Sequence, residues 1–175
     1  MSEIRLISKV GSQVLRQRSN SIASTIDPQL DRLIEDLIAT ADAANGVGIA
    51  APQVAQSLRL FIVASRPSPR YPHAPKMEPT AMINPEIIDR SHEVVAGWEG
   101  CLSVPDVRGL VSRHQSIKVR YLDRFGELVQ QELTGFVARI FQHELDHLDG
   151  ILFPDRVSNP QDLITEAEYL KIAFD

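Results

Sequence analysis

Residues 143–147, His-Glu-Leu-Asp-His, constrain the fold of this chain more than any other segment. The two histidines are four residues apart, so on an α-helix their imidazole rings lie on one face and can reach a single metal ion. Glu144 can then address a water molecule at that ion without binding the ion itself. We therefore expect a helix at 135–148, ended by Gly150, with the rest of the fold built around it.

A second long helix is predicted at 27–44, where apolar residues recur at helical spacing. Asp27 can cap its first turn, and Pro28 suits its first helical position. The prolines of 66–79 indicate an irregular loop. Extended segments are predicted at 58–64, 82–88, 93–98, 117–122 and 128–133, with a turn at 123–126.

The order of these segments predicts an α+β fold. The strands follow one another through hairpins and loops instead of alternating with helices, so we expect antiparallel sheets. These sheets should pack around the central metal-binding helix at 135–148. The N-terminal helix and a short C-terminal helix near 161–173, capped by Ser158 or Asn159, complete the prediction.

Length and charge limit the class of protein. A chain of 175 residues fits a single catalytic domain, 1–175, that needs no disulfide to bury a core. A net charge of −5 without a dense Lys/Arg cluster argues against stable nucleic-acid binding, although a transient ribosome contact through a small patch stays open. No apolar run reaches the ~18 residues of a membrane span, and residues 1–9 do not resemble a signal peptide, so we expect a cytoplasmic protein.

Two histidines do not complete a catalytic metal site, which usually has three protein ligands. One known extension of the motif places a third histidine downstream, but Phe153 stands there. A second solution uses a glutamate further along the chain, and Glu166 or Glu168 could provide it. A third solution is Cys101, the only cysteine, whose thiolate suits iron and zinc. The residues alone leave three possibilities open. The third ligand is Glu166 or Glu168, or it is Cys101, or Cys101 is only a buried structural residue.

A glycine-rich segment at 46–53, Gly-Val-Gly-Ile-Ala-Ala-Pro-Gln, follows the first predicted helix. Its glycines let backbone groups approach a ligand closely, and Gln53 can donate a hydrogen bond to an oxyanion. A glycine-rich segment after a helix is more often a simple connection. No predicted strand precedes it, so it is not a phosphate-binding loop.

Three segments together resemble the peptide deformylases: 46–53, Glu-Gly-Cys-Leu-Ser at 99–103, and the His-Glu-Leu-Asp-His helix. Their order and spacing match that family without a lost functional position. The resemblance implies a metal-dependent hydrolase that removes the N-formyl group from the N-terminal formylmethionine of nascent polypeptides and releases formate. It also implies one Fe²⁺ ion as cofactor, for which Zn²⁺, Ni²⁺ or Co²⁺ can substitute.

The resemblance assigns roles to single residues. Cys101, His143 and His147 correspond to the family's metal ligands. Glu144 corresponds to its general base and acid, which serves the attack of a metal-bound hydroxide on the formyl carbon.

Further positions correspond to groups that contact the substrate. Gln53 and the backbone N–H of Leu102 match the family's oxyanion donors. The expected substrate-binding positions, which pair with the peptide backbone or line the methionine pocket, are Val47, Gly48, Gly100 and Ile140.

Three residues near these motifs have open roles. Arg139 stands one turn before His143, where an apolar residue is more usual in the family, and it can recognise the peptide, pair with an acid or face solvent. Glu99 is expected to orient a ligand or to bind Arg113. Trp98 is expected to pack near the site.

Two other functions compete with this interpretation. A metallopeptidase that cuts internal peptide bonds would use Glu166 or Glu168 as its third ligand and would keep its metal without Cys101. A non-catalytic metal-binding or ribosome-interaction module would not release formate from formylmethionyl peptides.

Overall fold

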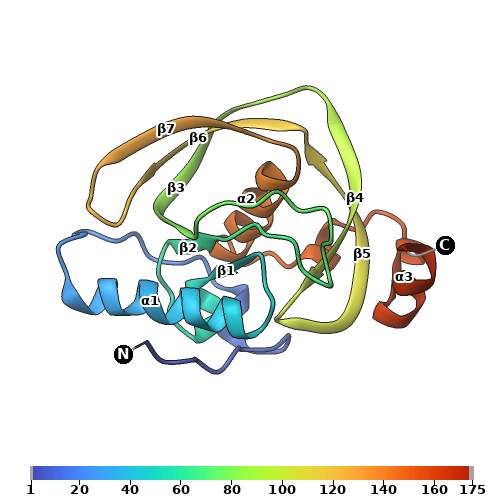
Figure 1. Ribbon diagram of the computed structural model, residues 1–175, viewed down its shortest axis with the longest axis horizontal. Coiled ribbons are helices and arrows are strands. Elements are labelled where there is room, and N and C mark those ends of the chain that lie inside the picture. The colour runs from blue at the N-terminus through green and yellow to red at the C-terminus, as the bar shows by residue number, and fades with distance from the viewer. Residues whose placement is uncertain (1, 174–175) are drawn as a thin grey trace.

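The helix that carries the histidine motif lies at the centre of the fold, as Figure 1 shows. The structure is a computed structural model that describes residues 2–173. This helix, α2, spans Gly135–Leu148 and buries residues on several sides, including Ala138, Phe141 and Leu148. Gly150 follows with a φ of +76°, a left-handed conformation that favours glycine and ends the helix as expected.

An antiparallel five-stranded sheet packs against α2. Within residues 2–173 its strand order is β1-β2-β3-β6-β7, and the bounds are Gly48–Ala50, Leu60–Val63, Thr80–Arg90, Ser116–Leu122 and Leu128–Thr134. Phe61 of β2 meets Phe141 of α2 edge to face, with ring centroids 5.1 Å apart. Aromatic packing therefore holds the sheet directly on the central helix.

The same sheet is covered on its other face by α1, Pro28–Ala43. Side chains alternate along β2, so Leu60 and Ile62 join the apolar cluster of α1, whereas Phe61 and Val63 join the cluster of α2. The side chain of Asp27 accepts a hydrogen bond from the N–H of Gln29 and caps α1 as predicted.

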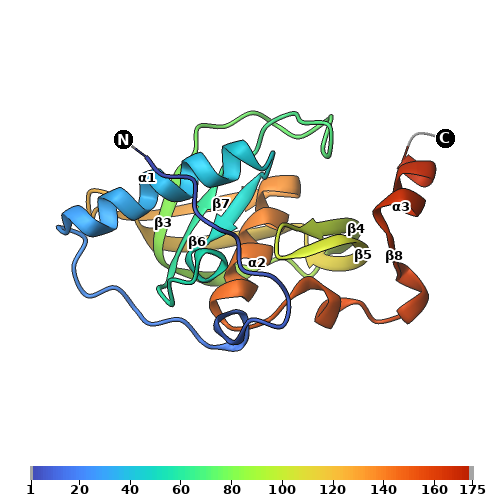
Figure 2. The ribbon, with the colours of Figure 1, turned by 90° about the horizontal axis from the view of Figure 1, so that it is seen from below.

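A second antiparallel sheet has the order β4-β5-β8 within the described chain. β4 spans Val94–Cys101, β5 spans Val104–His114, and β8 spans Leu163–Thr165. Figure 2 shows this sheet on one side of α2, with α3, Glu166–Ala173, beyond it. Because β4 ends at Cys101, the sheet delivers the cysteine to the central helix.

The predicted fold class is confirmed: antiparallel sheets pack around α2, with α1 before them and a short α3 after them. The C-terminal helix begins at Glu166 instead of near 161, because 163–165 pair with β5 as a strand. Asn159 caps only the single turn Pro160–Asp162, where its side chain accepts from the N–H of Gln161. No helix among the described residues is long and apolar enough to cross a bilayer.

Candidate metal centre and active site

Cys101, at the end of β4, meets the two histidines of α2. The possible ligand atoms of Cys101, His143 and His147 all lie within 4.8 Å of one another. The Sγ of Cys101 and the Nε2 of His147 are 3.2 Å apart. Burial disfavours the charged thiolate and by itself raises the pKa of Cys101. The nearby His147 and His143 favour the thiolate more strongly, so the pKa lies well below its ordinary value. One thiolate and two imidazoles around one point are a donor set that fits a divalent transition metal.

Glu99 of β4 orients one of these ligands. Its Oε2 lies 2.9 Å from the Nδ1 of His143, which leaves the Nε2 of that ring for a metal ion. Arg113 donates to both oxygens of Glu99, at 2.9 and 3.0 Å, so the predicted contact with Arg113 is present. Burial works against the carboxylate, but the hydrogen bonds from His143 and Arg113 outweigh it and hold the pKa of Glu99 below its usual range.

Arg139 pairs with an acid, which was one of the three possibilities open for it. Its Nη1 donates to Oε1 of Glu99 at 2.9 Å and to the carbonyl oxygen of Val111 at 2.8 Å. Its Nη2 donates to the carbonyl oxygen of Val95 at 2.6 Å. Arg139 therefore ties β4 and β5 to the central helix.

Glu144 lies buried beside Gly48 of β1. Its side chain has an oxygen, Oε2, without a hydrogen-bond partner among residues 2–173. A Cβ at Gly48 would lie 2.5 Å from Oε1 of Glu144 and 2.9 Å from Cγ2 of Ile140, so only glycine leaves room for this carboxylate. Burial raises the pKa of Glu144 to about 7. A carboxyl group with that pKa can both take up and release a proton near neutral pH.

Gln53 points its amide nitrogen at the cluster. It lies on the short helical turn Ala51–Val54, and its Oε1 accepts from the N–H of Ala50 at 2.8 Å. Its Nε2 lies 3.6 Å from the Sγ of Cys101 and 3.1 Å from the Oγ of Ser103. The amide is thus held with its donor toward the site.

The N-terminal segment binds the two loops on either side of this amide. The N–H of Ser8 donates to the carbonyl oxygen of Gln53 at 2.7 Å, and Nζ of Lys9 donates to that of Leu102, also at 2.7 Å. The N–H of Val10 donates to the carbonyl oxygen of Ser103 at 2.8 Å. A segment far away in the sequence therefore fixes both loops relative to each other.

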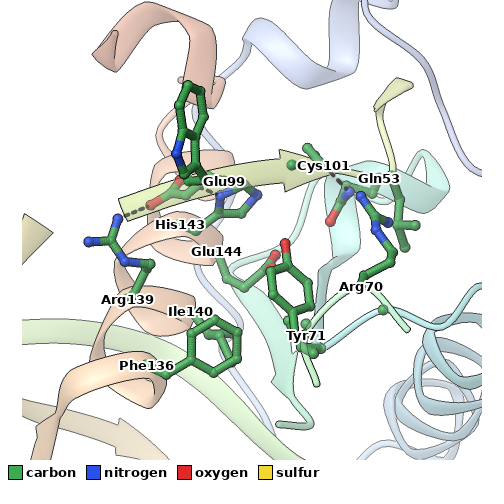
Figure 3. Close-up of a pocket in the computed structure, with 16 residues that line it drawn as sticks. Gln53, Arg70, Tyr71, Glu99, Cys101, Phe136, Arg139, Ile140, His143 and Glu144 are labelled. Carbon is green, nitrogen blue, oxygen red and sulfur yellow. Dashed lines mark hydrogen bonds and ion pairs between the residues drawn. The ribbon is translucent and has the colours of Figure 1, made fainter. Parts of the chain in front are cut away.

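A pocket opens beside the cluster, and Figure 3 shows the residues that line it. Every predicted site residue except His147 contributes to its wall. The wall also contains Arg70 and Tyr71 of the proline-rich loop and Phe136 of α2, which the sequence did not identify. Phe136 precedes Ile140 by one helical turn, so helical spacing was an available signal for it. No local pattern marks Tyr71, whose ring centroid lies 5.1 Å from that of Phe136.

Comparison with known proteins identifies the family. The family model described as polypeptide deformylase matches residues 4–162. The chain belongs to the peptide deformylase family. It is 62% identical over 170 residues to peptide deformylase 2 of Nostoc sp., a match that covers 97% of this chain and 95% of the relative. It is 47% identical to peptide deformylase 2 of Shewanella oneidensis, over 93% of this chain and 89% of that one.

Solved deformylase structures share the fold. The class I type b peptide deformylase of Acinetobacter baumannii with Met-Ala-Ser bound has a TM-score of 0.87 and 48% identity, over 90% of this chain and all of that one. The peptide deformylase of Thermotoga maritima has a TM-score of 0.80 and 39% identity, over 90% and 99% of the two chains. The chain is therefore a hydrolase of the deformylase family, which acts on nascent formylated peptides, and its Cys-His-His cluster supports a metal cofactor.

The glutamates that a metallopeptidase would need lie elsewhere in this deformylase fold. Glu166 accepts hydrogen bonds from Arg108, and Glu168 pairs with Lys171 at 2.7 Å. Among the described residues, the group that can hold a metal consists of Cys101 and the two histidines.

Proposed function

We propose that this protein removes the formyl group from formylmethionine at the start of nascent polypeptides, with one divalent metal ion held by Cys101, His143 and His147. The observation that carries the proposal is the convergence of these three side chains beside the buried Glu144. Fe²⁺ is the proposed native ion and Zn²⁺, Ni²⁺ or Co²⁺ are substitutes, because thiolate and imidazole donors suit all of them. When bound, the ion supplies Lewis acidity that activates water and polarises the formyl carbonyl.

Glu144 is the proposed proton carrier. As the oxygen of the water bonds to the formyl carbon, Oε2 of Glu144 takes the proton that the water gives up. Glu144 then delivers this proton to the amine nitrogen while the carbon–nitrogen bond breaks. The products are formic acid and the free amine of methionine; the acid ionises to formate and the amine takes up a proton, so atoms and protons balance. The lack of a side chain at Gly48 supports this role, because it leaves space for the carboxylate beside the pocket.

Gln53 and Leu102 are the proposed oxyanion donors. The Nε2 of Gln53 and the backbone N–H of Leu102 would donate to the formyl oxygen as it becomes negative. Hydrogen bonds that strengthen only in the transition state lower the barrier, and losing one such donor typically costs about 3–4 kcal/mol. The fixed orientation of the Gln53 amide supports its part in this pair.

The peptide is proposed to bind between the edges of β1 and β4. The backbone groups of Val47, Gly48 and Gly100 would pair with it, and Ile140 would contact the methionine side chain. All four positions line the pocket. We further propose that 1–175 act as a single catalytic domain in the cytoplasm, where translation supplies formylated chains. A transient ribosome contact stays a prediction.

Formate release from formyl-Met-Ala-Ser by the iron-loaded protein under anaerobic conditions tests this function. Glu144→Gln should keep one metal ion per chain and lose at least about 100-fold in kcat, since it removes the proton carrier. Cys101→Ala should lose the metal itself. Absence of formate release by the wild-type protein would favour a non-catalytic metal-binding module, and cleavage of internal peptide bonds would favour a peptidase.

A further inference from the structure

Arg108 of β5 is a buried guanidinium outside the metal centre. Its side chain has 0% exposure, and its carboxylate partner comes from α3. Nε of Arg108 donates to Oε2 of Glu166 at 2.6 Å, and Nη2 donates to Oε1 at 3.0 Å. These hydrogen bonds hold the pKa of the Glu166 carboxyl below its usual value. Removing the partner of a buried guanidinium leaves an uncompensated charge and destabilises the folded protein. The pairing with Glu166 therefore fixes where the Arg108 side chain lies.

Arg108 in turn holds an aromatic residue of the pocket. Its Nη1 donates to the Oη of Tyr71 at 3.1 Å, and its guanidinium lies 5.1 Å from the centroid of the Tyr71 ring. On α3, the ring of Tyr169 lies 4.6 Å from the same guanidinium. Two aromatic rings and one carboxylate therefore surround Arg108, and contacts run from α3 through Arg108 to Tyr71.

Tyr71 belongs to the proline-rich loop between β2 and β3, yet it forms part of the pocket wall with Phe136 and Ile140. Figure 3 shows the rings of Tyr71 and Phe136 among the side chains that line the pocket together with Glu144. Tyr169 also contacts Trp98, with ring centroids 5.9 Å apart, and Trp98 lines the same pocket. Segment 163–173 thus supports two wall residues without entering the pocket itself.

We propose that this segment completes the substrate pocket: Tyr71 contacts the methionine side chain, and Glu166, through Arg108, is the positioning residue that holds Tyr71 there. The inference rests on the function proposed above and adds a specificity determinant to it. A thioether sulfur packs favourably against aromatic rings, so a Tyr71–Phe136 wall favours methionine over smaller side chains. Glu166 and Tyr169 lie beyond residues 4–162, which match the family model, and their role follows from the contacts of this chain.

Substrate preference tests the proposal. The ratio of kcat/KM for formyl-Met-Ala-Ser to that for formyl-Ala-Ala-Ser is measured for the metal-loaded wild type, Glu166→Ala, Tyr71→Ala and the double variant. We expect both single variants to lose about 10-fold of the preference through KM, the size typical of one apolar pocket contact. The double variant should lose no more than Tyr71→Ala, because both changes remove the same contact. Glu168→Ala, a control on the exposed side of α3, should keep the preference.

Two further measurements separate positioning from general damage. Trp98 is the only tryptophan, so its emission reports whether Tyr169 stays docked, independently of catalysis. Emission should shift in Glu166→Ala and not in Glu168→Ala. Glu166→Gln keeps an oxygen that can accept from Arg108, and it should restore part of the preference. An equal loss of kcat/KM for both peptides in Glu166→Ala would indicate a purely structural role and overturn the proposal.

The remaining outcomes are also decisive. If the wild type releases formate and Tyr71→Ala keeps the full methionine preference, the inference is overturned while the deformylase function stands. Tyr71→Ala leaves the Arg108–Glu166 pair intact, so it tests the inference even if Glu166→Ala does not fold. If the wild type releases no formate from either peptide, the proposed function fails and this inference fails with it.

Discussion

Gly48 contributes to the site because it has no side chain. Replacing it with alanine would put a Cβ 2.5 Å from an oxygen of Glu144, and this carboxylate or the strand would have to move. For Gly48→Ala we expect kcat for formate release to fall at least about 100-fold, the usual contribution of a general base, with metal content unchanged. Formate release and metal analysis measure the two quantities.

Gly11→Ala is the control for this substitution. Gly11 has a φ of +102° and no heavy atom within 4 Å of an added Cβ, so the change should lower stability through backbone strain alone. An unchanged kcat in Gly48→Ala would contradict the steric explanation.

Glu99 acts on the metal through His143. For Glu99→Gln we expect metal affinity to fall about 10- to 100-fold, because the ring of His143 loses the carboxylate that orients it and raises its basicity. Competition with a chelator of known affinity measures this. Glu86→Gln removes an exposed partner of Arg120 and should leave metal affinity unchanged. Equal affinities in the wild type and Glu99→Gln would show that His143 is oriented without Glu99.

Arg139 links secondary-structure elements to one another. It bonds to carbonyl oxygens of β4 and β5 as well as to Glu99, so Arg139→Met should leave these acceptors without their donor. We expect a loss of about 1–3 kcal/mol in the free energy of unfolding and faster amide exchange in β4. Urea denaturation and hydrogen exchange measure these effects. The matched change Arg120→Met on the surface of β6 should cost little, and a similar small cost for Arg139→Met would contradict the linking role.

Elements with a strong local pattern can be predicted from the sequence. The apolar stripe and cap define α1, the histidine spacing defines α2, and alternation defines β6. The turn at 123–126 identifies β7 as the hairpin partner of β6. No part of β5 is predicted from the sequence, because Pro105, Asp106 and Gly109 interrupt its pattern, and Asp106 has a φ of +64°. The sequence places β8 within a helix, because its pairing with β5 is a long-range contact.

The site shows the same difference between residues marked by a local sequence motif and residues placed by long-range contacts. The metal ligands and Glu144 lie in compact motifs, so residue type and spacing are enough to indicate them. Tyr71 carries no such signal, because its place in the pocket depends on Arg108, 37 residues away in the sequence. Glu166 is a possible metal ligand by residue type, since its carboxylate is a donor, yet the fold gives it Arg108 as partner.

At the scale of the whole molecule, the metal ligands connect one sheet to the central helix. Removing the ion by chelation should therefore lower Tm, since a ligand at about 1,000 times its Kd stabilises the native state by about 4 kcal/mol. Calorimetry of metal-free protein should show the loss, and added Ni²⁺ should restore Tm. Cys101→Ser should respond much less to added metal. A Tm independent of metal would contradict a native-state site that bridges β4 and α2.

The N-terminal segment is held on α1 by a carboxylate that depends on pH. Asp36 is buried and accepts hydrogen bonds from the N–H of Glu3 and the side chain of Arg5. Burial raises the pKa of Asp36, but these partners outweigh it and the pKa lies below its ordinary value. The stabilisation is therefore complete above the unfolded pKa of about 3.9 and is lost as the pH falls through the lower folded value.

The variant Asp36→Asn should be about 1–3 kcal/mol less stable than the wild type at pH 7. This difference should shrink as the pH falls below about 4, which denaturant titrations across pH measure. Asp31→Asn changes an exposed carboxylate of α1 and serves as control. A difference that stays constant down to about pH 2 would contradict the assignment to Asp36.

Cys101 is the only cysteine of the chain. Its side chain is 5% exposed and packs beside His147, so the thiol is shielded from other molecules. An intermolecular disulfide can form only when two molecules have both released this sulfur from the interior. Covalent dimers on a non-reducing gel therefore indicate that some molecules of a preparation have opened or never folded.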